Sequence, residues 1–132
     1  MKKDIENRPD IDALMVRFYE RAVADKEIGF LFTDVAHLDL KHHLPVIGDF
    51  WETVLFGTGE YQRHGRNPLQ IHAFLHQKSP LAASHFRRWL ELFEQAVDES
   101  FSGGRAEFIK LRARAIANRF STFLNETALS AA

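Results

Sequence analysis

The sequence predicts an all-α fold, and three observations indicate this class. Apolar residues recur at spacings of three and four in four long stretches, as they do along one face of an α-helix. Nowhere do several residues alternate cleanly between apolar and polar, the pattern of a half-buried strand. A chain of 132 residues, 45% of them hydrophobic, is also long enough to bury one core without disulfides. We therefore expect one helical domain over residues 1–132, with residues 1–10 as an N-terminal extension and residues 126–132 as a frayed C-terminal tail.

The first helix is expected over residues 11–25, with Asp10 as its N-cap. Its apolar residues form one stripe that also contains Tyr19, so this tyrosine should point inward. Gly29 ends the element, and the segment GFLFTD holds Phe32 in a turn or a single helical turn.

The second helix is expected over residues 44–56, because Pro45 is tolerated in a first turn and disfavoured deeper in a helix. Extending the helical angle backward places His43 near the inner face and His42 to one side, which makes His43 the inward candidate of the two. The inner face consists of Ile47, Phe50, Trp51, Val54 and Leu55.

Residues 57–67 contain three glycines and no period, and they predict a surface loop. Pro68 then opens a short element that contains His72. Ser79 and Pro80 form a strong start signal for the next helix, as N-cap and first helical residue. That helix carries Phe86, Trp89, Leu90, Phe93 and Val97 at helical spacing.

The last helix is expected over residues 105–125, after the pair Gly103-Gly104. Its inner side aligns Ile109, Ile116, Phe120 and Phe123. The basic residues of RAEFIKLRARAIANR then belong to its solvated face rather than to a nucleic-acid surface.

Composition excludes several classes of function. A formal net charge of −1 does not provide the basic surface that general nucleic-acid binding requires. The absence of cysteine excludes disulfides, thiolate metal sites and covalent CxxCH haem attachment. No apolar run approaches the ~18 residues of a membrane span, and the start MKKDIENRPD is not a secretory signal. We therefore expect a cytoplasmic protein with neither a membrane nor a nucleic acid as partner.

Four polar groups interrupt the aromatic-rich interior: Tyr19, His43, His72 and the indole N–H of Trp89. His72 needs explanation most, because PLQIHAFLH surrounds it with apolar side chains and burying an unpaired polar group costs about 1–3 kcal/mol. The imidazole can bond a backbone carbonyl as a core residue. It can instead give one nitrogen to a metal and donate the other to a carbonyl, as axial haem ligands do.

A second metal interpretation uses His76, which lies four residues after His72. The HExxH pattern of zinc hydrolases is excluded because residue 73 is alanine. A two-histidine site completed by Asp or Glu elsewhere stays open.

Six segments, in this order and spacing, resemble a truncated haemoglobin of the third group, a bacterial-like globin: FYERA, GFLF, HHLPVIGDFW, NPLQIH, HFRRWLELF and RARAIANRF. The likeness runs from about residue 11 to residue 124 and so covers nearly the whole chain. It implies a single truncated-globin domain, a two-over-two helical sandwich that holds haem b.

The resemblance also implies roles for individual residues. His72 would be the proximal ligand of the iron, Tyr19 and Trp89 the distal donors to a bound ligand, and His43 the distal histidine that gates access. The haem would contact Phe32, Ile47, Phe50, Leu69, His72, Leu75, Phe86, Trp89 and Phe93. The basic residues Arg63, His64, Arg66 and Lys78 lie near the part of the chain that would meet the propionates.

The function implied by the resemblance is binding of the diatomic ligands O2, CO and NO at ferrous iron. Suggested activities in such proteins are NO dioxygenase and peroxidase-like chemistry, with a cellular reductase as partner. The alternatives are a haem or gas sensor, an O2 carrier without turnover, and a non-haem helical interaction or metal-binding domain.

Overall fold

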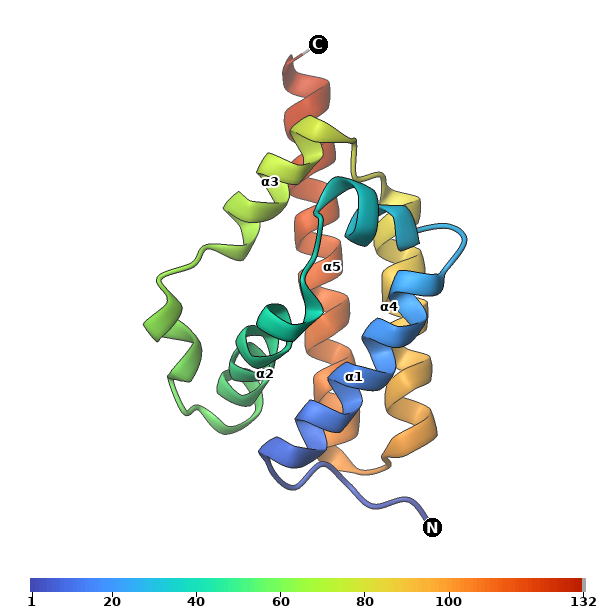
Figure 1. Ribbon diagram of the computed structural model, residues 1–132, viewed down its shortest axis with the longest axis vertical. Helices are drawn as coiled ribbons and strands as arrows, with labels where there is room; N and C mark the ends of the chain where they lie inside the picture. Colours follow the sequence, from blue (N-terminus) through green and yellow to red (C-terminus); the bar gives the residue numbers. More distant parts are fainter. Residues whose placement is uncertain (132) are drawn as a thin grey trace.

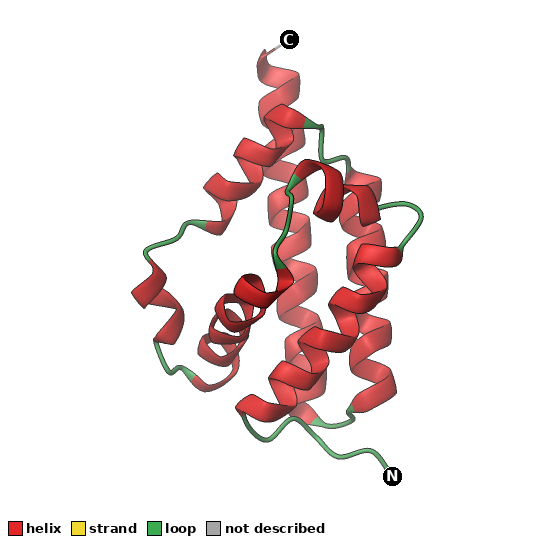
Figure 2. Cartoon of the chain, in the orientation of Figure 1, coloured by secondary structure: helices red, strands yellow, loops and turns green. Residues whose placement is uncertain are grey.

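The computed structural model describes the backbone of residues 1–131 and the side chains of residues 1–125, and every regular element in that part is a helix (Figure 2). The elements are α1 (Arg8–Ala24), η1 (Leu31–Val35), α2 (Leu40–Phe56), η2 (Glu60–His64), α3 (Pro68–Lys78), α4 (Ala83–Ser100) and α5 (Gly104–Ala131). The all-α class is therefore confirmed. The expected tail at residues 126–132 lies outside the residues whose side chains are described.

The long helices form two pairs, one packed on the other. α1 contacts α2, α4 contacts α5, and the first pair rests on the second through α1 on α4 and α2 on α5 (Figure 1). The short α3 packs against the C-terminal half of α5 (Figure 1). The fully buried core lies mainly between α1, α4 and α5, with Phe18 and Phe93 as its largest side chains.

α1 begins earlier than the sequence indicates, and the expectation of Asp10 as N-cap was wrong. Asn7 adopts an extended backbone, and its side chain accepts from the backbone N–H of Asp10 at 3.3 Å. Asp10 instead accepts from Lys3 Nζ at 2.6 Å and from the Glu6 N–H at 2.9 Å. Both residues are good caps by chemistry, and the contacts of the preceding segment decide between them.

α2 also begins earlier, at Leu40, with Asp39 as its side-chain cap. Pro45 therefore lies inside this helix, and its expected place in the first turn was wrong. A proline at this position removes the hydrogen bond to the carbonyl of Lys41. Lys41 and Pro45 are both exposed, so water can satisfy that carbonyl. On the inner side, the Pro45 carbonyl accepts from Arg8 Nη2 at 3.1 Å, a contact that ties α2 to α1.

The connector between α3 and α4 differs most from expectation. Ser79 ends α3 as its C-cap, and α4 begins at Ala83, so Ser79-Pro80 does not start the helix. The free backbone N–H groups of Leu81 and Ala82 donate to ring nitrogens, Nδ1 of His76 at 2.8 Å and Nδ1 of His85 at 3.0 Å. Histidine side chains thus supply the acceptors that a Ser cap would have provided.

Two further segments refine the expected picture. The loop at residues 57–67 contains the short helix η2, and Gly57, Gly59 and Gly65 all adopt positive φ around it. Phe123 is 46% exposed, so its expected inward position on the last helix was wrong. The buried side of α5 is centred on Ala106, Ile109, Ala113, Ala117 and Leu124.

No helix in the described part of the chain is long and apolar enough to cross a membrane.

The N-terminal segment packs against the beginning of α5. Ile5 is fully buried, and the carboxylate of Asp4 accepts from the backbone N–H groups of Arg105 and Ala106, both at 2.9 Å. Asp4 therefore caps α5 from a distance in sequence of a hundred residues. Gly103 adopts φ +140° beside this carboxylate, where an added Cβ would lie 2.6 Å from Asp4 Cγ.

We predict that Asp4→Ala lowers the free energy of unfolding by about 1–2 kcal/mol, the usual cost of losing a helix cap. Urea denaturation followed by circular dichroism measures this change. Glu20→Ala is the control, because Glu20 is exposed and makes no side-chain hydrogen bond among the described residues. Equal stability of the two variants would show that Asp4 does not act as a cap.

Candidate functional site

A buried hydrogen bond joins α1 to α2 at the centre of the candidate site. The hydroxyl of Tyr19, a residue only 6% exposed, lies 3.0 Å from Nε2 of His43. The two rings meet edge to face, with centroids 5.3 Å apart. His42 turns outward and bonds Asp39 at 2.6 Å. His43 is thus the inward member of the histidine pair.

Both members of this pair are neutral near pH 7. Burial raises the pKa of Tyr19 well above its ordinary value, so the phenol keeps its proton. Burial also lowers the pKa of His43 to about 4, and the positive charge of Arg66 acts in the same direction, as would a charge on His72 if that ring were protonated. One proton therefore lies between the two facing atoms: either Tyr19 donates to Nε2, or Nε2–H donates to Tyr19 and leaves the phenol O–H free.

Trp89 of α4 lies on the same interior cluster. Its indole stacks on Phe93 at 5.2 Å, and the edge of Phe18 meets it at 5.6 Å. Phe18 also contacts Tyr19 at 5.0 Å, so one phenylalanine of α1 connects the two distal candidates. Among the described residues the Trp89 indole N–H has no acceptor. It is a donor available to a ligand.

Phe18 was not singled out from the sequence as a site residue. The signal was present, because Phe18 belongs to the inward stripe of α1 and immediately precedes Tyr19. The sequence pattern does not reveal which core aromatic lies between two polar groups.

Phe32, Ile47 and Phe50 lie where the sequence placed them, on the half-buried wall beside the core. The ring of Phe32, in η1, meets Tyr19 edge-on at 5.9 Å. Phe50 packs between Trp51 and Tyr61, at 5.0 and 5.1 Å.

His72 lies on α3 with its ring fixed by its own helix. Its Nδ1 lies 2.7 Å from the carbonyl of Pro68, and that contact requires the proton on Nδ1. Burial lowers the pKa of His72, although the bond to Pro68 acts in the opposite direction, so the ring is neutral. Within the described residues Nε2 makes no hydrogen bond, and it remains accessible, because no fully buried side-chain nitrogen or oxygen there lacks a partner. Its lone pair is available to a metal.

The local sequence explains why α3 presents this ring. Asn67 caps the helix by accepting from the N–H of Gln70 at 3.2 Å, and Pro68 occupies the first turn. The carbonyl of Pro68 then lies one turn before His72. On the other side, Phe120 of α5 packs against the imidazole at 4.9 Å. The sequence aligned Phe120 inward but did not pair it with His72.

His72 lies close enough to His43 that a positive charge on the His72 ring would lower the pKa of His43. Leu69, Leu75 and Phe86 are half-buried. No aromatic or hydrogen-bonding contact in the described residues joins these three to the Tyr19–His43 pair, so their place at a cofactor stays a prediction. Leu69 lines a groove of about 240 Å³ between α3 and α5, together with Ala73 and Phe123.

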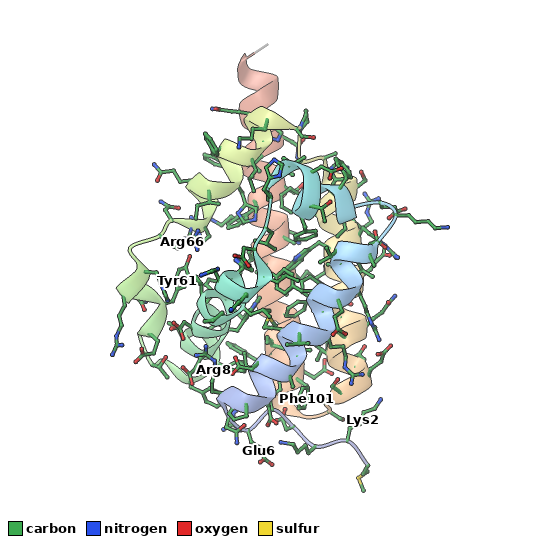
Figure 3. All side chains as sticks on the ribbon, in the orientation of Figure 1. Lys2, Glu6, Arg8, Tyr61, Arg66 and Phe101 are labelled. Carbon is green, nitrogen blue, oxygen red and sulfur yellow. The ribbon has the colours of Figure 1, made fainter. Side chains whose placement is uncertain are left out.

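Four basic residues near the site differ in what they bind. Arg63 and His64 bond carboxylates of neighbouring residues, at 3.1 and 2.8 Å, and Lys78 lies over an aromatic ring at 4.8 Å. Arg66 has no ion pair in the described part of the chain, and its charge acts on the pKa of both His43 and Tyr61. Figure 3 labels Arg66 and Tyr61 on the side of the molecule that carries η2 and the start of α3.

The donor set suits haem. A neutral imidazole with a free Nε2 is a single ligand for a metal that brings its other ligands, as haem iron does. Its Nδ1–H bond to a carbonyl is the usual support of a metal-bound histidine. The described residues hold no cluster of three His, Cys, Asp or Glu side chains that could bind a metal ion by themselves.

Comparison with known proteins agrees with this arrangement. Residues 3–122 match the family model described as bacterial-like globin. The chain is 32% identical over 127 residues to the group 3 truncated hemoglobin Ctb of Campylobacter jejuni, covering 94% of this chain and 95% of that protein. The crystal structure of the group III truncated hemoglobin from Campylobacter jejuni superposes with a TM-score of 0.81 at 33% identity, over 94% of this chain and 95% of that one.

We predict that acid destabilises the ligand-free protein partly through His43. Its folded pKa of about 4 lies below the ordinary value of about 6.5, so the unfolded chain binds more protons between these values. The contribution to stability is complete above about pH 6.5 and is lost as the pH falls toward 4. The NMR titration of the His43 ring should have its midpoint near 4.

The His43→Gln variant should accordingly show a flatter dependence of unfolding free energy on pH in this range. His42→Gln, which removes the exposed neighbouring histidine, should not flatten the profile. A His43 midpoint at or above 6 would contradict the assigned burial.

Proposed function

This chain belongs to the bacterial-like globin family, and on that premise we propose that it holds haem b on His72 and binds O2, CO and NO opposite that residue. The observation that carries the proposal is the state of the His72 ring. Its Nδ1–H donates to the Pro68 carbonyl at 2.7 Å, and its Nε2 makes no hydrogen bond among the described residues. The all-helical fold and the family membership support a haem cofactor.

When bound, ferrous haem supplies an open coordination position for a diatomic ligand. The residues of this chain then decide how the ligand is held. Tyr19 is buried and Trp89 is half-buried, and on this proposal they are the donors on the face opposite His72. Phe32, Ile47 and Phe50, which pack against the core, would be the apolar walls of the site.

The Tyr19–His43 bond prepares the phenol for this role. With its proton on Nε2, His43 donates to the Tyr19 oxygen, and the phenol O–H is left to donate to a ligand in the site. The indole N–H of Trp89 is a second donor from α4. In a water-poor interior such donors stabilise ligand atoms on which negative charge develops, each by about 1–3 kcal/mol. His43 would close the side of the site that faces Arg66.

Arg66 is the basic residue that we propose for the haem carboxylates. It is exposed, carries no ion pair within residues 1–125, and acts electrostatically on His43 and Tyr61 at the edge of the site. Guanidinium groups bind carboxylates in two-point geometry. The other basic residues of this region already have partners.

We predict that His72→Ala, purified from haem-replete cells, lacks the Soret band of the parent protein, because the iron has lost its protein ligand. Added imidazole should restore the band, which shows that the variant has folded. The matched control is His76→Ala, whose ring accepts from the Leu81 N–H within the connector. A normal spectrum for His72→Ala would make another residue the ligand.

We predict that Tyr19→Phe releases O2 about 10- to 100-fold faster than the parent, the change expected from losing one hydrogen bond of about 1–3 kcal/mol to a charged acceptor. Stopped-flow displacement of O2 by CO measures the rate. Tyr61→Phe is the control, because this second tyrosine packs on Phe50 near the surface rather than on His43. An unchanged rate for Tyr19→Phe would remove this residue from ligand binding.

A further inference from the structure

The side of α5 that points away from the core carries apolar residues where an amphipathic helix normally carries polar ones. Phe108 is 45% exposed and Leu111 is 61% exposed. At ~100° per residue, Leu111 lies about 160° from the buried Ile109 and Ala113, and Phe108 lies about 140° from Ala113. Phe123 is exposed at the edge of the same side. We call the residues Phe108, Leu111, Arg112, Ala115, Arg119 and Phe123 the outer face of α5.

The charges of α5 divide between its two sides. Toward α4 the cations are paired, since Lys110 bonds Asp98 at 2.7 Å and Arg114 bonds Glu94 at 2.9 Å. On the outer face Arg112 and Arg119 are exposed and have no ion pair within residues 1–125. Between residues 104 and 125 the one carboxylate of α5 is Glu107, which bonds Lys110 at 3.0 Å, so the unpaired charges of the outer face are positive.

The outer face adjoins the candidate haem site on its proximal side. Phe120, whose ring packs on His72 at 4.9 Å, directly follows Arg119 in the sequence. Phe123 lines the groove of about 240 Å³ between α5 and α3, together with Leu69 and Ala73. A protein bound to the outer face would be separated from His72 by one helix, about 10 Å across.

We propose that the outer face of α5 is the docking surface for an acidic protein and, resting on the function proposed above, that this partner is the flavin-containing electron donor of the haem. In the reaction one electron leaves the reduced flavin and enters the ferric haem, and no bond is formed or broken. Exposed aromatic and aliphatic residues with arginines around them are the composition of protein interfaces. Unpaired arginines steer an acidic partner to the surface.

Charge also decides against a second copy of this chain as the occupant. Two outer faces in contact would bring Arg112 and Arg119 of one molecule against the same residues of the other, with no carboxylate on either face to separate them. Like charges in such contact cost several kcal/mol. The complementary surface must therefore be acidic.

The experiment uses the purified ferric protein and a bacterial flavodoxin, an acidic one-electron donor. The test variant is the double charge reversal Arg112→Glu, Arg119→Glu. The matched control is Lys26→Glu, Arg87→Glu, which changes the net charge equally through two exposed cations that make no ion pair within residues 1–125. The rate of haem reduction by flavodoxin hydroquinone is measured at low salt and at 0.5 M NaCl.

At low salt we expect the test variant to be reduced at least about tenfold more slowly than the parent, the lower end of electrostatic steering effects, and the control at most twofold more slowly. At 0.5 M NaCl the two variants should converge, because salt screens exposed charges. Leu111→Ser should lower the rate at both salt concentrations. Dithionite, a small reductant, should reduce all variants equally.

An equal loss of rate in the two double variants would overturn the proposal, since net charge alone would then explain the effect. Binding of the outer face to vesicles with 30% phosphatidylserine, without binding to flavodoxin, would overturn it in favour of a membrane. A protein without a Soret band would refute the proposed function separately. In that case interferometry measures the affinity of the protein for oxidised flavodoxin. Equal affinities of the parent and the test variant would show that the outer face is not the docking surface.

Discussion

The hydrogen bond from His72 to the carbonyl of Pro68 is the interaction on which the candidate site depends. It places the proton on Nδ1, fixes the plane of the ring and leaves the Nε2 lone pair free in the interior. A protonated imidazole has no lone pair for a metal, and one that donated through Nε2 could bind a metal only through Nδ1. Burial acts in the same direction, because it lowers the pKa of His72. The cap at Asn67, the proline in the first turn and the ring of Phe120 all hold this one bond in place.

The same principle applies to Tyr19, His43 and Trp89: a polar group in an apolar interior either pairs with another group of the protein or is available to a ligand. Tyr19 and His43 pair with each other across α1 and α2, and burial keeps both neutral. Trp89 stacks its large ring on Phe93 and leaves its N–H without an acceptor in the described residues. Together these groups give a dry site a small number of donors. In such surroundings a hydrogen bond is electrostatically stronger than in water.

Competing partners close in the sequence set the beginnings of several helices. Asp10, Pro45 and Ser79 are sound local signals, yet the helices begin at Arg8, Leu40 and Ala83. Asn7 caps α1 in place of Asp10. In α2 the carbonyl of exposed Lys41, which loses its helical hydrogen bond at Pro45, can bind water. His76 and His85 accept from the backbone N–H groups that precede α4. The Arg8 guanidinium also links two helices, because it bonds Asp12 of its own helix and both Asp49 and the Pro45 carbonyl of α2. Local chemistry offers several starts, and packing selects one.

The sequence by itself determined the all-α class, four helices of long or middling length with a short element around His72, the resemblance to the family, and the inward direction expected of Tyr19, His43, Trp89 and His72. It could do so because helical periodicity is a local property and states which side of each helix faces the core. Only the tertiary structure decided which inward residues meet. The placement of the helices relative to one another brings Phe18 between Tyr19 and Trp89 and packs Phe120 on His72. It also lets Asp4 cap α5 and leaves Arg66 without an ion pair among the described residues. The exposure of Phe123 has the same cause, because a periodic stripe is wider than the surface that neighbouring helices cover.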